Sequence, residues 1–508
     1  MPVNVDSEAT RSLWADTEVA PDAVPLKSDE RAGAVVIGSG IAGLSIAYEL
    51  MQRDIDVVML DRGPIGKGIT ARTTAHLSPI CDDTFESFAK IRGEDMAKMF
   101  WQSHAVAIER IEKIVDDLRI ECNFRRLDAF LFPAPETKQS ELDSELKAVR
   151  RTGAEAEKIH GVPFKGLENT GVLRYRNQAT FHPLRYLRGL AAEIIKRGGR
   201  IYADTCVTEI AEKGESVTVK TDQGHSIHAT AAVVATNSPI NDRVALHTKL
   251  APYRTYAMCF TVPKDALPDA LYWDTMDPYH YVRQHPGPGS VNYLIVGGGD
   301  HKTGEANDAQ VRFEALEAWM RNLFPALGKE THRWSGQVLD TIDYASFTGV
   351  NPGSKRVYVH TGDSGQGITH GVMASLLISD LISKGSSPWT ELYEPSRKPP
   401  KSALNFVNEN VTALKNFAEY VAPGERGSVD ELAPGEGAIV REGLRKIAAF
   451  RDEKGKLYKC SAACTHIGCH VHWNALERCW DCPCHGSQFA IDGTALNGPA
   501  VAPLQRYD

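Results

Sequence analysis

Residues 34–61 hold the pattern that most restricts the fold of this chain. The apolar run Ala34–Ile37 is followed by the turn G-S-G-I-A-G and by a helical pattern. A second apolar run, Val57–Leu60, then ends at an acidic residue. Strand, glycine turn, helix, strand and acid in this order are typical of a dinucleotide-binding βαβ unit. The segment therefore predicts a parallel sheet with helices packed on it.

Each position of this unit has an expected role. Gly38 makes the tight turn, Gly40 lets the backbone approach a pyrophosphate, and Gly43 allows close packing of helix on strand. Asp61 is spaced to accept a hydrogen bond from a ribose hydroxyl. The expected dinucleotide contacts are Gly38, Gly40, Ile41, Ala42, Gly43, Asp61 and Arg62.

Three features favour FAD over a nicotinamide cofactor. The unit lies near the N-terminus of a long, interrupted chain, a strand pair at 206–219 leads into Ala232–Asn237, and Val357–Gly367 precedes a helix. Gly297–Gly299 leads into a polar loop without a helix, so a second nicotinamide fingerprint is not expected. The further FAD contacts expected are Val207, Thr236, Gly362, Asp363, Gly365, Gly367 and Ile368, with Arg72 and His76 beside the isoalloxazine ring.

Two short boxes of cysteine and histidine predict a metal centre near the C-terminus. Cys464 and His466 form C-x-H, and after fifteen residues Cys482 and His485 form C-x-x-H. Two thiolates and two imidazoles are the ligands of a Rieske [2Fe–2S] cluster. A structural zinc site is the alternative, but zinc motifs repeat pairs of like spacing, whereas these boxes differ. The boxes predict an electron-transfer centre.

This segment resembles the high-potential Rieske proteins of cytochrome bc complexes. The resemblance implies a disulfide between Cys469 and Cys484 and a hydrogen bond from Ser487 to a cluster sulfur. Phe489 stands where that pattern has a second donor, a tyrosine, so we expect a potential below the top of the roughly −150 to +300 mV Rieske range. Gly498–Ala500 matches the loop that covers the cluster, and the last strand is expected to be short or missing.

Composition limits the partners of the chain. With 508 residues it needs more than one domain, and its net charge of −8 argues against nucleic acid or an anionic membrane as partner. The acidic N-terminus has no signal-like apolar core, and no run approaches the roughly 18 apolar residues of a membrane span. We expect a cytoplasmic protein without a membrane span.

Composition and pattern together suggest four regions. We expect an α/β, Rossmann-like FAD-binding domain with an inserted antiparallel-sheet substrate domain, followed by an all-β Rieske domain. The four regions are a loosely ordered extension at 1–30, an oxidoreductase at 31–385, a linker at 386–426 with a helix at about 402–420, and the Rieske domain at 427–508. Within the oxidoreductase, the FAD-binding segments are at about 31–82, 186–240 and 346–385. The substrate-domain segments are at about 83–185 and 241–345.

Residues 30–385 resemble the D-amino-acid oxidase / glycine–sarcosine oxidase superfamily, in particular its gamma-glutamylputrescine oxidoreductase-like branch. Trp334–Gly336 and Gly362–Gly371 carry the likeness, and the whole chain resembles bacterial fusions of such an oxidoreductase with a Rieske domain. Trp334–Phe347 lacks the cysteine that links FAD in sarcosine oxidases, so FAD is expected to be non-covalent. Thr369 replaces the lysine that grips the substrate carboxylate in amino-acid-acting members, which argues against a simple sarcosine-like substrate.

These observations predict a dehydrogenase for a small amine or amino-acid derivative. Hydride would pass to FAD, and electrons would leave singly through the cluster to an acceptor protein or a quinone. An oxygen-using oxidase with a structural Rieske domain and an electron-transfer component for a partner oxygenase remain alternatives. The substrate-pocket candidates, each of which could instead be a packed aromatic or a solvated cation, are Tyr253, Arg254, Tyr256, Tyr281, Arg283 and His370.

Overall fold

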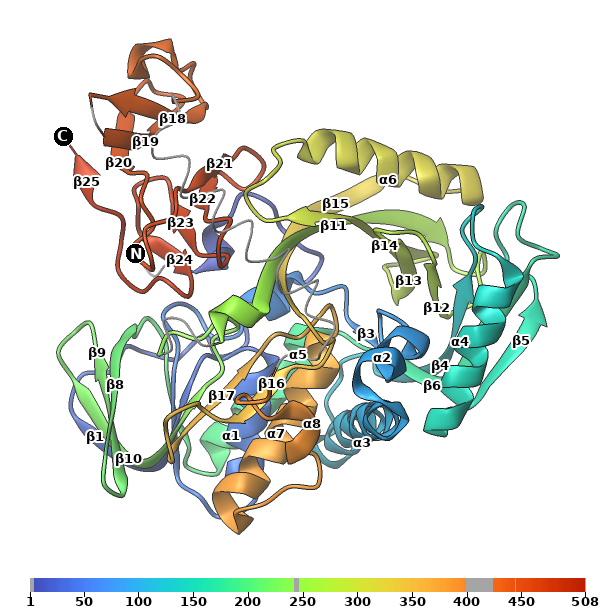
Figure 1. Cartoon of the computed structure of the whole chain (residues 1–508), viewed down its shortest axis with the longest axis horizontal. Coiled ribbons are helices and arrows are strands. Elements are labelled where there is room, and N and C mark those ends of the chain that lie inside the picture. Colours follow the sequence, from blue (N-terminus) through green and yellow to red (C-terminus); the bar gives the residue numbers. More distant parts are fainter. Residues whose placement is uncertain (1–3, 242–245, 399–423, 444, 508) are drawn as a thin grey trace.

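The computed structural model describes residues 4–241, 246–398, 424–443 and 445–507. These residues form a nucleotide-binding layer, a large antiparallel sheet above it, and a C-terminal all-β domain at one end of that sheet (Figure 1). The helix expected at 402–420 lies outside the described residues.

The nucleotide-binding layer is a sheet in the order β16-β17-β10-β1-β2-β7. Its inner strands are parallel, and the edge strand β16 is antiparallel. The strands are β1 (Glu30–Ile37), β2 (Val57–Leu60), β7 (Arg200–Tyr202), β10 (Ser226–Val234), β16 (Phe347–Val350) and β17 (Val357–Thr361). The strand–helix–strand pattern of the sequence is therefore present as expected.

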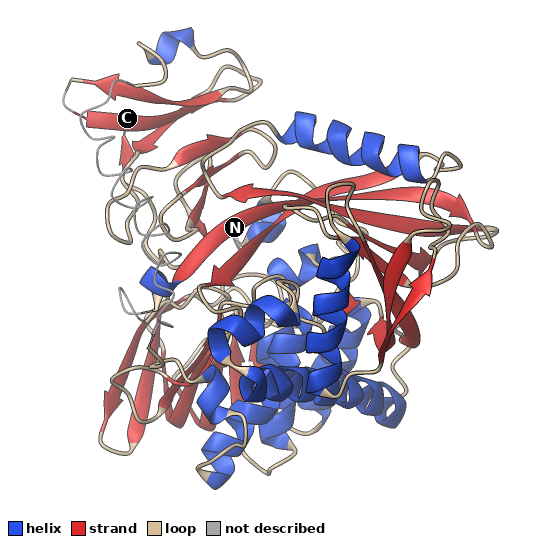
Figure 2. Ribbon diagram, turned by 45° about the vertical axis from the view of Figure 1, so that its right-hand side comes forward, coloured by secondary structure: helices blue, strands red, loops and turns tan. Residues whose placement is uncertain are grey.

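The two faces of β1 pack against different elements because its side chains alternate. Ala34 and Val36 join a core with helices α1 (Ile41–Met51), α5 (Pro183–Lys196) and α7 (Gly367–Lys384). Val35 and Ile37 instead join a core with the hairpin β8 (Val207–Lys213) and β9 (Ser216–Thr221). The helices gather below the large sheet (Figure 2).

The large sheet runs in the order β15-β11-β14-β13-β12-β4-β6-β3, with β5 paired to β6. Pairing is antiparallel except between β12 and β4. Its strands are β3 (His76–Leu77), β4 (Arg125–Phe132), β5 (Ala156–His160), β6 (Gly171–Thr180), β11 (Leu250–Pro263), β12 (Leu271–Asp274), β13 (Tyr281–Pro286), β14 (Val291–Lys302) and β15 (Glu330–Thr341). The expected inserted antiparallel sheet is thus present.

Helices cover both sides of this sheet. Helix α6 (Ala309–Leu323) packs on the outer face through Phe313, Leu316 and Met320. Helices α2 (Phe85–Arg92), α3 (Glu94–Leu118) and α4 (Gln139–Thr152) share the core of the nucleotide-binding layer. The sheet therefore lies between α6 and the rest of the oxidoreductase.

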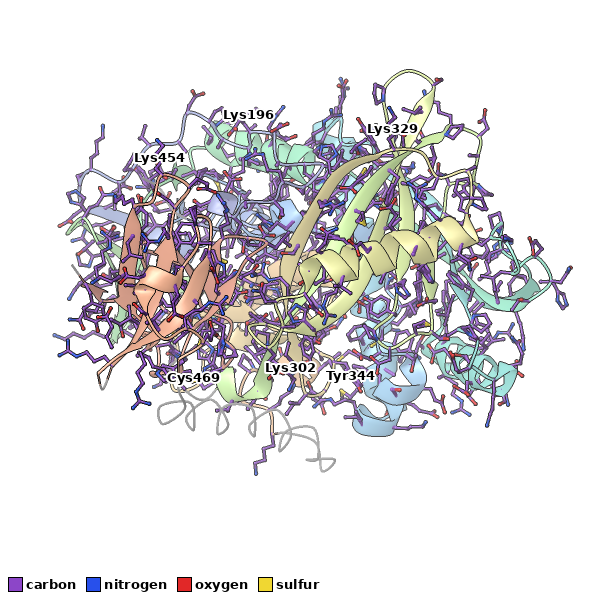
Figure 3. The ribbon with its side chains drawn as sticks, turned by 90° about the horizontal axis from the view of Figure 1, so that it is seen from above. Lys196, Lys302, Lys329, Tyr344, Lys454 and Cys469 are labelled. Carbon is purple, nitrogen blue, oxygen red and sulfur yellow. A yellow bond between two sulfur atoms is a disulfide. The ribbon has the colours of Figure 1, made fainter. Side chains whose placement is uncertain are left out.

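The C-terminal domain consists of two four-stranded antiparallel sheets. It lies beside α6 and the end of β11 in both views (Figures 1 and 3). The strands are β18 (Gly437–Glu442), β19 (Arg445–Arg451), β20 (Leu457–Ser461) and β25 (Arg506–Tyr507) in one sheet, and β21 (His472–Asn474), β22 (Cys479–Asp481), β23 (Gln488–Ala490) and β24 (Ala495–Asn497) in the other. The last strand, β25, is short and pairs with β20.

The expectation of a loosely ordered N-terminal extension was wrong for the residues described. Val5, Glu8, Trp14 and Leu26 are buried. The indole N–H of Trp14 donates to the Thr73 carbonyl over 2.7 Å. Glu8 of this polar segment packs between the domains, where it meets Arg72 and Arg254.

The first part of the expected linker, residues 386–398, is also packed. Helix α8 (Thr390–Tyr393) buries Leu392 and Tyr393. Both outer nitrogens of the Arg397 fork, Nε and Nη2, bind the Asp343 carboxylate at 2.8 Å. This part of the chain therefore belongs to the oxidoreductase, although its Ser/Pro-rich sequence is typical of a linker.

Candidate functional site: a dinucleotide cavity beside two cysteine–histidine loops

A cavity of about 350 Å³ lies between the nucleotide-binding layer and the large sheet. Its wall includes Leu496 and Asn497 of the C-terminal domain. The expected FAD contacts that line it are Gly38, Gly40, Ile41, Ala42, Asp61, Arg62, Arg72, His76, Val207, Thr236, Asp363, Gly365, Gly367 and Ile368. Segments far apart in sequence therefore meet at one site.

Gly43 and Gly362 stand behind this wall. A methyl group added at Gly43 would lie 1.8 Å from the Gly38 carbonyl oxygen, so Gly43 permits the close approach of α1 to the turn. Gly362 has φ +76°, and an added methyl would lie 2.5 Å from the Thr341 side chain. The two glycines shape the backbone of the cavity without facing it.

Two helices begin at the cavity, and the N-cap residue of neither helix supplies a side-chain cap, although the Thr70 hydroxyl accepts a hydrogen bond from the Ile41 N–H at 3.0 Å. The two helices are α1, preceded by Gly40, and α7, preceded by Gln366. A methyl added at Gly371 of α7 would lie 3.0 Å from the Ala42 nitrogen, so the two helix starts approach closely. Unsatisfied N–H groups and the positive ends of two helix dipoles favour an anion here. The arrangement fits the pyrophosphate of a dinucleotide.

Two more features fit a bound dinucleotide. The side-chain Nδ2 of Asn237, which lines the cavity, is buried without a hydrogen-bond partner among the described residues. Asp61 accepts hydrogen bonds from the Ser39 amide at 2.8 Å, the Ser39 hydroxyl at 2.6 Å and the Gly63 amide at 3.0 Å. Burial raises the pKa of Asp61. These bonds hold its carboxylate at the cavity edge, where a ribose hydroxyl would lie.

Arg72 and His76 differ in what they offer to the cavity. The Arg72 guanidinium points into a buried network, where Nε lies 3.0 Å from Glu8 and Nη1 lies 3.2 Å from Glu477. Carboxylates therefore hold this guanidinium, and a contact of Arg72, which lines the cavity, with the flavin stays a prediction. His76 lines the cavity with its ring edge-on to Tyr281, and burial, with Arg283, lowers the pKa of His76 to about 3. A neutral imidazole stands at this wall.

Of the six substrate-pocket candidates, Tyr281 lines the cavity. On β11 it is Thr255 and Ala257 that face the cavity, so the alternating neighbours Arg254 and Tyr256 point to the other face. The two outer nitrogens of Arg254 bind Glu8 and Asp481, and Tyr256 packs edge-on against Phe313. Strand alternation therefore places Arg254 and Tyr256 outside the substrate pocket, contrary to the expectation from the sequence.

The other three candidates also lie outside the described lining. Arg283 is buried with its guanidinium 5.5 Å from the Trp14 ring centre. His370 packs against His104 inside the helical layer, with ring centroids 4.3 Å apart. Tyr253 is half-buried on β11, one step beyond the residues that face the cavity. Arg283 and His370 are therefore packed inside the protein, away from the cavity lining.

Acidic residues that the sequence reasoning missed form the other end of the cavity. Asp82 and Asp83 on the loop after β3, and Asp300 on β14, line it together with Trp273 and Tyr279. Burial raises the pKa of Asp82 to about 7 and that of Asp300 to about 6. No short motif links 82 with 300, so only the fold, which brings the loop after β3 to the same cavity as β14, reveals the group.

The predicted cluster ligands lie on two loops of the C-terminal domain, one between β20 and β21 and one between β22 and β23. A hydrogen bond from the Cys482 thiol, with a smaller one from Ser487, lowers the pKa of Cys464. The rings of His466 and His485 lie 5.0 Å apart, edge to face. Thiol pairs with thiol and imidazole with imidazole, which is the division that a two-iron cluster needs.

The donor set fits such a cluster better than a single metal ion. Within the described residues, no three His, Cys, Asp or Glu side chains converge as one ion would require. The buried His485 Nδ1 has no hydrogen-bond partner in the described part of the chain. A neutral imidazole is needed for ligation, and burial lowers the pKa of His485 to about 3. The zinc alternative is therefore disfavoured by geometry as well as by spacing.

The disulfide expected between Cys469 and Cys484 is present. It joins the two ligand loops, since Cys469 follows the first box and Cys484 lies inside the second. Gly468 and Gly486 follow the boxes with φ +92° and +78°, so glycine allows both loops to turn. The result is one compact cage with buried Cys464 and Cys482.

The histidine side of this cage faces the oxidoreductase. His247, which is 1% exposed, lies with its ring centroid 4.9 Å from His466 and 5.7 Å from His485. Nearby, the Gln337 Nε2 donates to the Gly486 carbonyl at 3.0 Å, and the Asn497 Nδ2 donates to the Gln337 Oε1 at 3.0 Å. The cage and the dinucleotide cavity thus share a wall.

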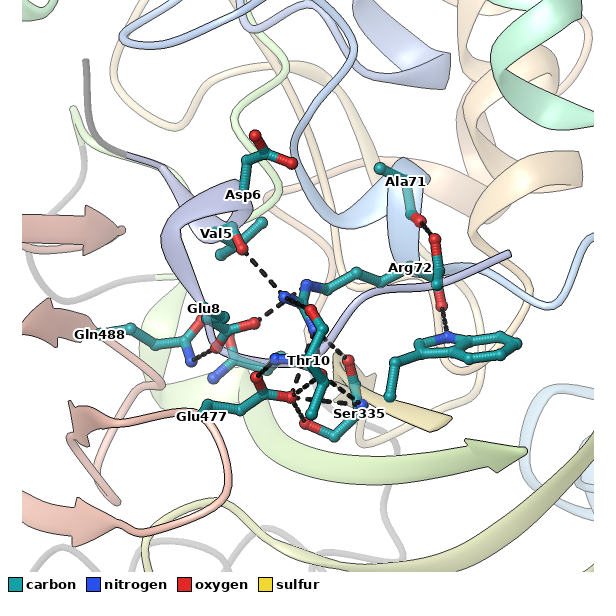
Figure 4. A network of polar contacts seen from close by, with 12 residues as sticks. Val5, Asp6, Glu8, Thr10, Ala71, Arg72, Ser335, Glu477 and Gln488 are labelled. Carbon is teal, nitrogen blue, oxygen red and sulfur yellow. Dashed lines mark hydrogen bonds and ion pairs between the residues drawn. The ribbon is translucent and has the colours of Figure 1, made fainter. Parts of the chain in front are cut away.

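A buried charge network holds the two domains together (Figure 4). Glu8 of the N-terminal segment lies between Arg72 and Arg254, at 3.0 and 3.1 Å. On the C-terminal domain, Asp481 binds Arg254 and Glu477 binds Arg72. Burial acts against the charge of Glu477, but Arg72 and Arg254 keep its pKa below the usual value. Each buried charge therefore has an opposite partner.

Comparison with known proteins identifies both parts. The family model described as FAD dependent oxidoreductase matches residues 34–381, which is most of the chain. The chain belongs to the FAD-dependent oxidoreductase family. A second model, the Rieske [2Fe-2S] domain, matches residues 425–508. The family binds FAD, and the Rieske domain carries a [2Fe–2S] cluster.

Individual relatives support this FAD–Rieske oxidoreductase as one unit. YhfW of Bacillus subtilis (strain 168), named as a Rieske 2Fe-2S iron-sulfur protein, is 32% identical over 99% of this chain and 98% of its own length. Gamma-glutamylputrescine oxidoreductase of Escherichia coli (strain K12) is 26% identical, covering 68% of this chain and 82% of its own. Both domains are therefore found together in another protein.

The fold of the oxidoreductase part is found in solved structures. L-proline dehydrogenase from P. horikoshii superposes with a TM-score of 0.60 at 20% identity, covering 74% of this chain and 98% of its own. At this identity the likeness concerns the fold. Among the described residues, no helix combines the length and apolar character needed to cross a bilayer.

Proposed function

We propose that this protein is a dehydrogenase that oxidises a small amine or amino-acid derivative and passes the electrons singly through its own Rieske cluster to an external acceptor. Bound FAD accepts an electron pair and can release it one electron at a time, and a Rieske cluster carries one electron. The acceptor is a protein that takes up one electron at a time, or a quinone. The cytoplasmic location expected from the sequence stays a prediction.

One contact supports the internal route most directly. Gln337 lines the dinucleotide cavity, and its Nε2 donates at 3.0 Å to the carbonyl of Gly486, the residue that follows the ligand His485. A single side chain therefore joins the cavity wall to the cluster loop. A Rieske domain kept only for structure would not require its histidine side to be closed against the FAD site.

The exposed residues beside the cluster ligands suggest where electrons leave the cluster. His247 covers the two histidines on the oxidoreductase side, whereas Thr465 and Ile467, on either side of His466, are exposed. A partner can therefore approach the cage at these two residues. The E. coli relative is named for gamma-glutamylputrescine, which supports an amine or amino-acid derivative as substrate here.

The experiment compares the yields of hydrogen peroxide and of reduced acceptor. With substrate, oxygen and a one-electron acceptor present, we expect most electrons to reach the acceptor. In His485→Cys, acceptor reduction should fall at least tenfold while the substrate still bleaches the flavin. Stoichiometric peroxide in both proteins would favour the oxidase alternative. A flavin that only a protein reductant bleaches would favour the electron-transfer component.

A further inference from the structure

We propose that the acidic end of the cavity selects a diamine or polyamine, a substrate with a second cationic nitrogen and no free carboxylate. This inference rests on the amine-dehydrogenase function proposed above and names its substrate class. The site comprises Asp82, Asp83 and Asp300, with Tyr279 and Tyr281 beside them; we call it the acidic end.

The three carboxylates come from two segments that the fold brings together. Asp82 and Asp83 lie between β3 and α2, and Asp300 lies near the end of β14. The Tyr279 hydroxyl donates to Asp82 Oδ2 over 2.9 Å. Asp300 Oδ1 is buried and has no hydrogen-bond partner among the described residues. A buried carboxylate oxygen facing a cavity calls for a donor, and a bound ammonium supplies one.

The negative charge of the acidic end is not neutralised by the cavity wall. Among the described residues that line the cavity, the arginines are Arg62 and Arg72, and none is a lysine. Arg72 is bound by Glu8 and Glu477, and Arg62 stands beside Asp61 at the expected ribose end. A ligand carboxylate would meet three carboxylates and no available guanidinium, so the site repels amino acids and attracts cations.

The ionisation of these groups agrees with the geometry. Asp82 and Asp83 are exposed to the cavity, yet protein encloses the rest of their surroundings. Burial raises the pKa of Asp82 to about 7 and, with Asp277 adding repulsion, that of Asp83 to about 6. A cation bound between such groups favours their charged forms and lowers these pKa values again. Binding of a cation near pH 6.5 should therefore release protons.

Aromatic rings form the sides of the acidic end. The rings of Tyr279 and Tyr281 lie 5.6 Å apart, and His76 meets Tyr281 edge-on at 5.2 Å. A methyl added at Gly297 on β14 would lie 2.2 Å from the Tyr281 ring, so the glycine makes room for it. Tyrosine faces attract ammonium groups, which adds to the carboxylates.

The acidic end adjoins the turn expected to meet the flavin. A methyl added at Gly365 would lie 2.4 Å from Asp82 Oδ2. The Gln366 side chain donates to the carbonyls of Ser78 at 3.1 Å and Ile80 at 2.7 Å, which ties this turn to the loop that bears Asp82. A substrate held by the acids therefore reaches the reacting part of the cavity.

The reaction requires an uncharged nitrogen at the reacting carbon, whereas binding to the acidic end requires a charged one. Removal of hydride from a C–H bond needs the lone pair of the adjacent nitrogen, so the reacting nitrogen must be uncharged. Its proton can pass to a carboxylate such as Asp82, whose pKa of about 7 suits a base near neutral pH. A nitrogen that stays charged and bound to the acidic end is then a different one, which leads to a diamine.

Isothermal titration calorimetry of the FAD-loaded protein, under anaerobic conditions, tests this directly. The probes are 1,4-diaminobutane, 1-aminobutane, 4-aminobutanoate and 1-butanol. We expect the diamine to bind at least tenfold more tightly than the others and its heat at pH 6.5 to depend on the buffer. Asp300→Asn should weaken diamine binding at least tenfold, whereas a change of the exposed Asp308 just before α6, Asp308→Asn, should not.

Equal affinity for 4-aminobutanoate and the diamine, or unchanged diamine affinity in Asp300→Asn, would overturn the inference. Asp83→Asn replaces Asp300→Asn if the latter loses its FAD. The readout separates the two proposals, because binding needs no electron transfer. A diamine that binds but never bleaches the flavin contradicts the dehydrogenase function alone. Flavin and cluster reduction by a compound that carries no positive charge contradicts the substrate class alone.

Discussion

The fold changes the protonation of Asp82, and this change is the one most relevant to function. Its side chain faces the cavity, accepts a hydrogen bond from Tyr279, and has Asp83 and Asp300 as neighbours. Burial is the largest cause of a pKa of about 7, against an ordinary value of 3.8. Such a group is poised to hold or accept a proton at neutral pH.

The same shift predicts a pH effect on stability. Between about pH 4 and 7 the folded state keeps the Asp82 proton that the unfolded chain has lost, so the free energy of unfolding falls as pH rises through this window. In Asp82→Asn this fall disappears. We expect the variant to melt higher than wild type at pH 8, with a smaller difference at pH 4, in thermal scans without substrate.

The ligand histidines give a second prediction for single residues. His485→Cys should abolish the Rieske-type EPR signal of the reduced protein, because the histidine-bound iron would gain a thiolate. FAD absorbance should remain, since His485 belongs to the cluster loop. His472→Cys, which changes a half-buried histidine of the same domain, should keep the signal. An unchanged spectrum in His485→Cys would remove His485 from the ligand set.

Single residues were predictable where their chemistry is local in sequence. The four cluster ligands and Gly38 each stand in a short motif whose spacing states their role. Arg72 and Arg254 could not be assigned in this way, because Glu8, Glu477 and Asp481 lie hundreds of residues from one or both of them. An arginine near a cofactor motif looks the same whether it binds ligand or a distant carboxylate.

Secondary-structure elements set the direction in which side chains point. Strand β11 presents Thr255 and Ala257 to the cavity and Arg254 to the domain junction, so one strand serves both sites. The sequence reasoning expected Gly297–Gly299 to lead into a polar loop at Asp300–Gly304, but β14 continues through Lys302. Gly297 makes room for Tyr281 on the adjacent strand β13, and Gly298 makes room for His280, which precedes that strand. Without the pairing partner, such glycines are typical of a loop.

The junction predicts a strong effect of one buried arginine. Arg254→Met leaves Glu8 and Asp481 buried without their shared cation, which should cost about 3–5 kcal/mol of unfolding free energy. The control change Arg151→Met breaks an exposed pair with Glu94 and should cost about 1 kcal/mol or less. Chemical denaturation followed by flavin fluorescence measures both. Equal effects would contradict a structural role of the buried network.

At the scale of the whole molecule, two domains that are widely separated in sequence share one wall. The C-terminal domain contributes Leu496 and Asn497 to the FAD cavity. The N-terminal segment places Glu8 between Arg72 and Arg254, and Arg254 belongs to the large sheet. Domain types and their order were predictable, because each carries its own motif. Their docking was not, because it depends on complementary surfaces rather than on a local pattern.

The arrangement supports the proposal that electrons pass within one chain. His247 covers the histidine side of the cluster, and Gln337 joins the cavity wall to the cluster loop. A route of this kind needs no collision between molecules.

The most direct test is freeze-quench EPR after anaerobic mixing with substrate, at protein concentrations that differ tenfold. We predict that the reduced cluster appears with a first-order rate constant that does not change with protein concentration and that each chain reduces its own cluster. A rate constant that rises in proportion to concentration, or a cluster that stays oxidised after the flavin has bleached, would contradict the account.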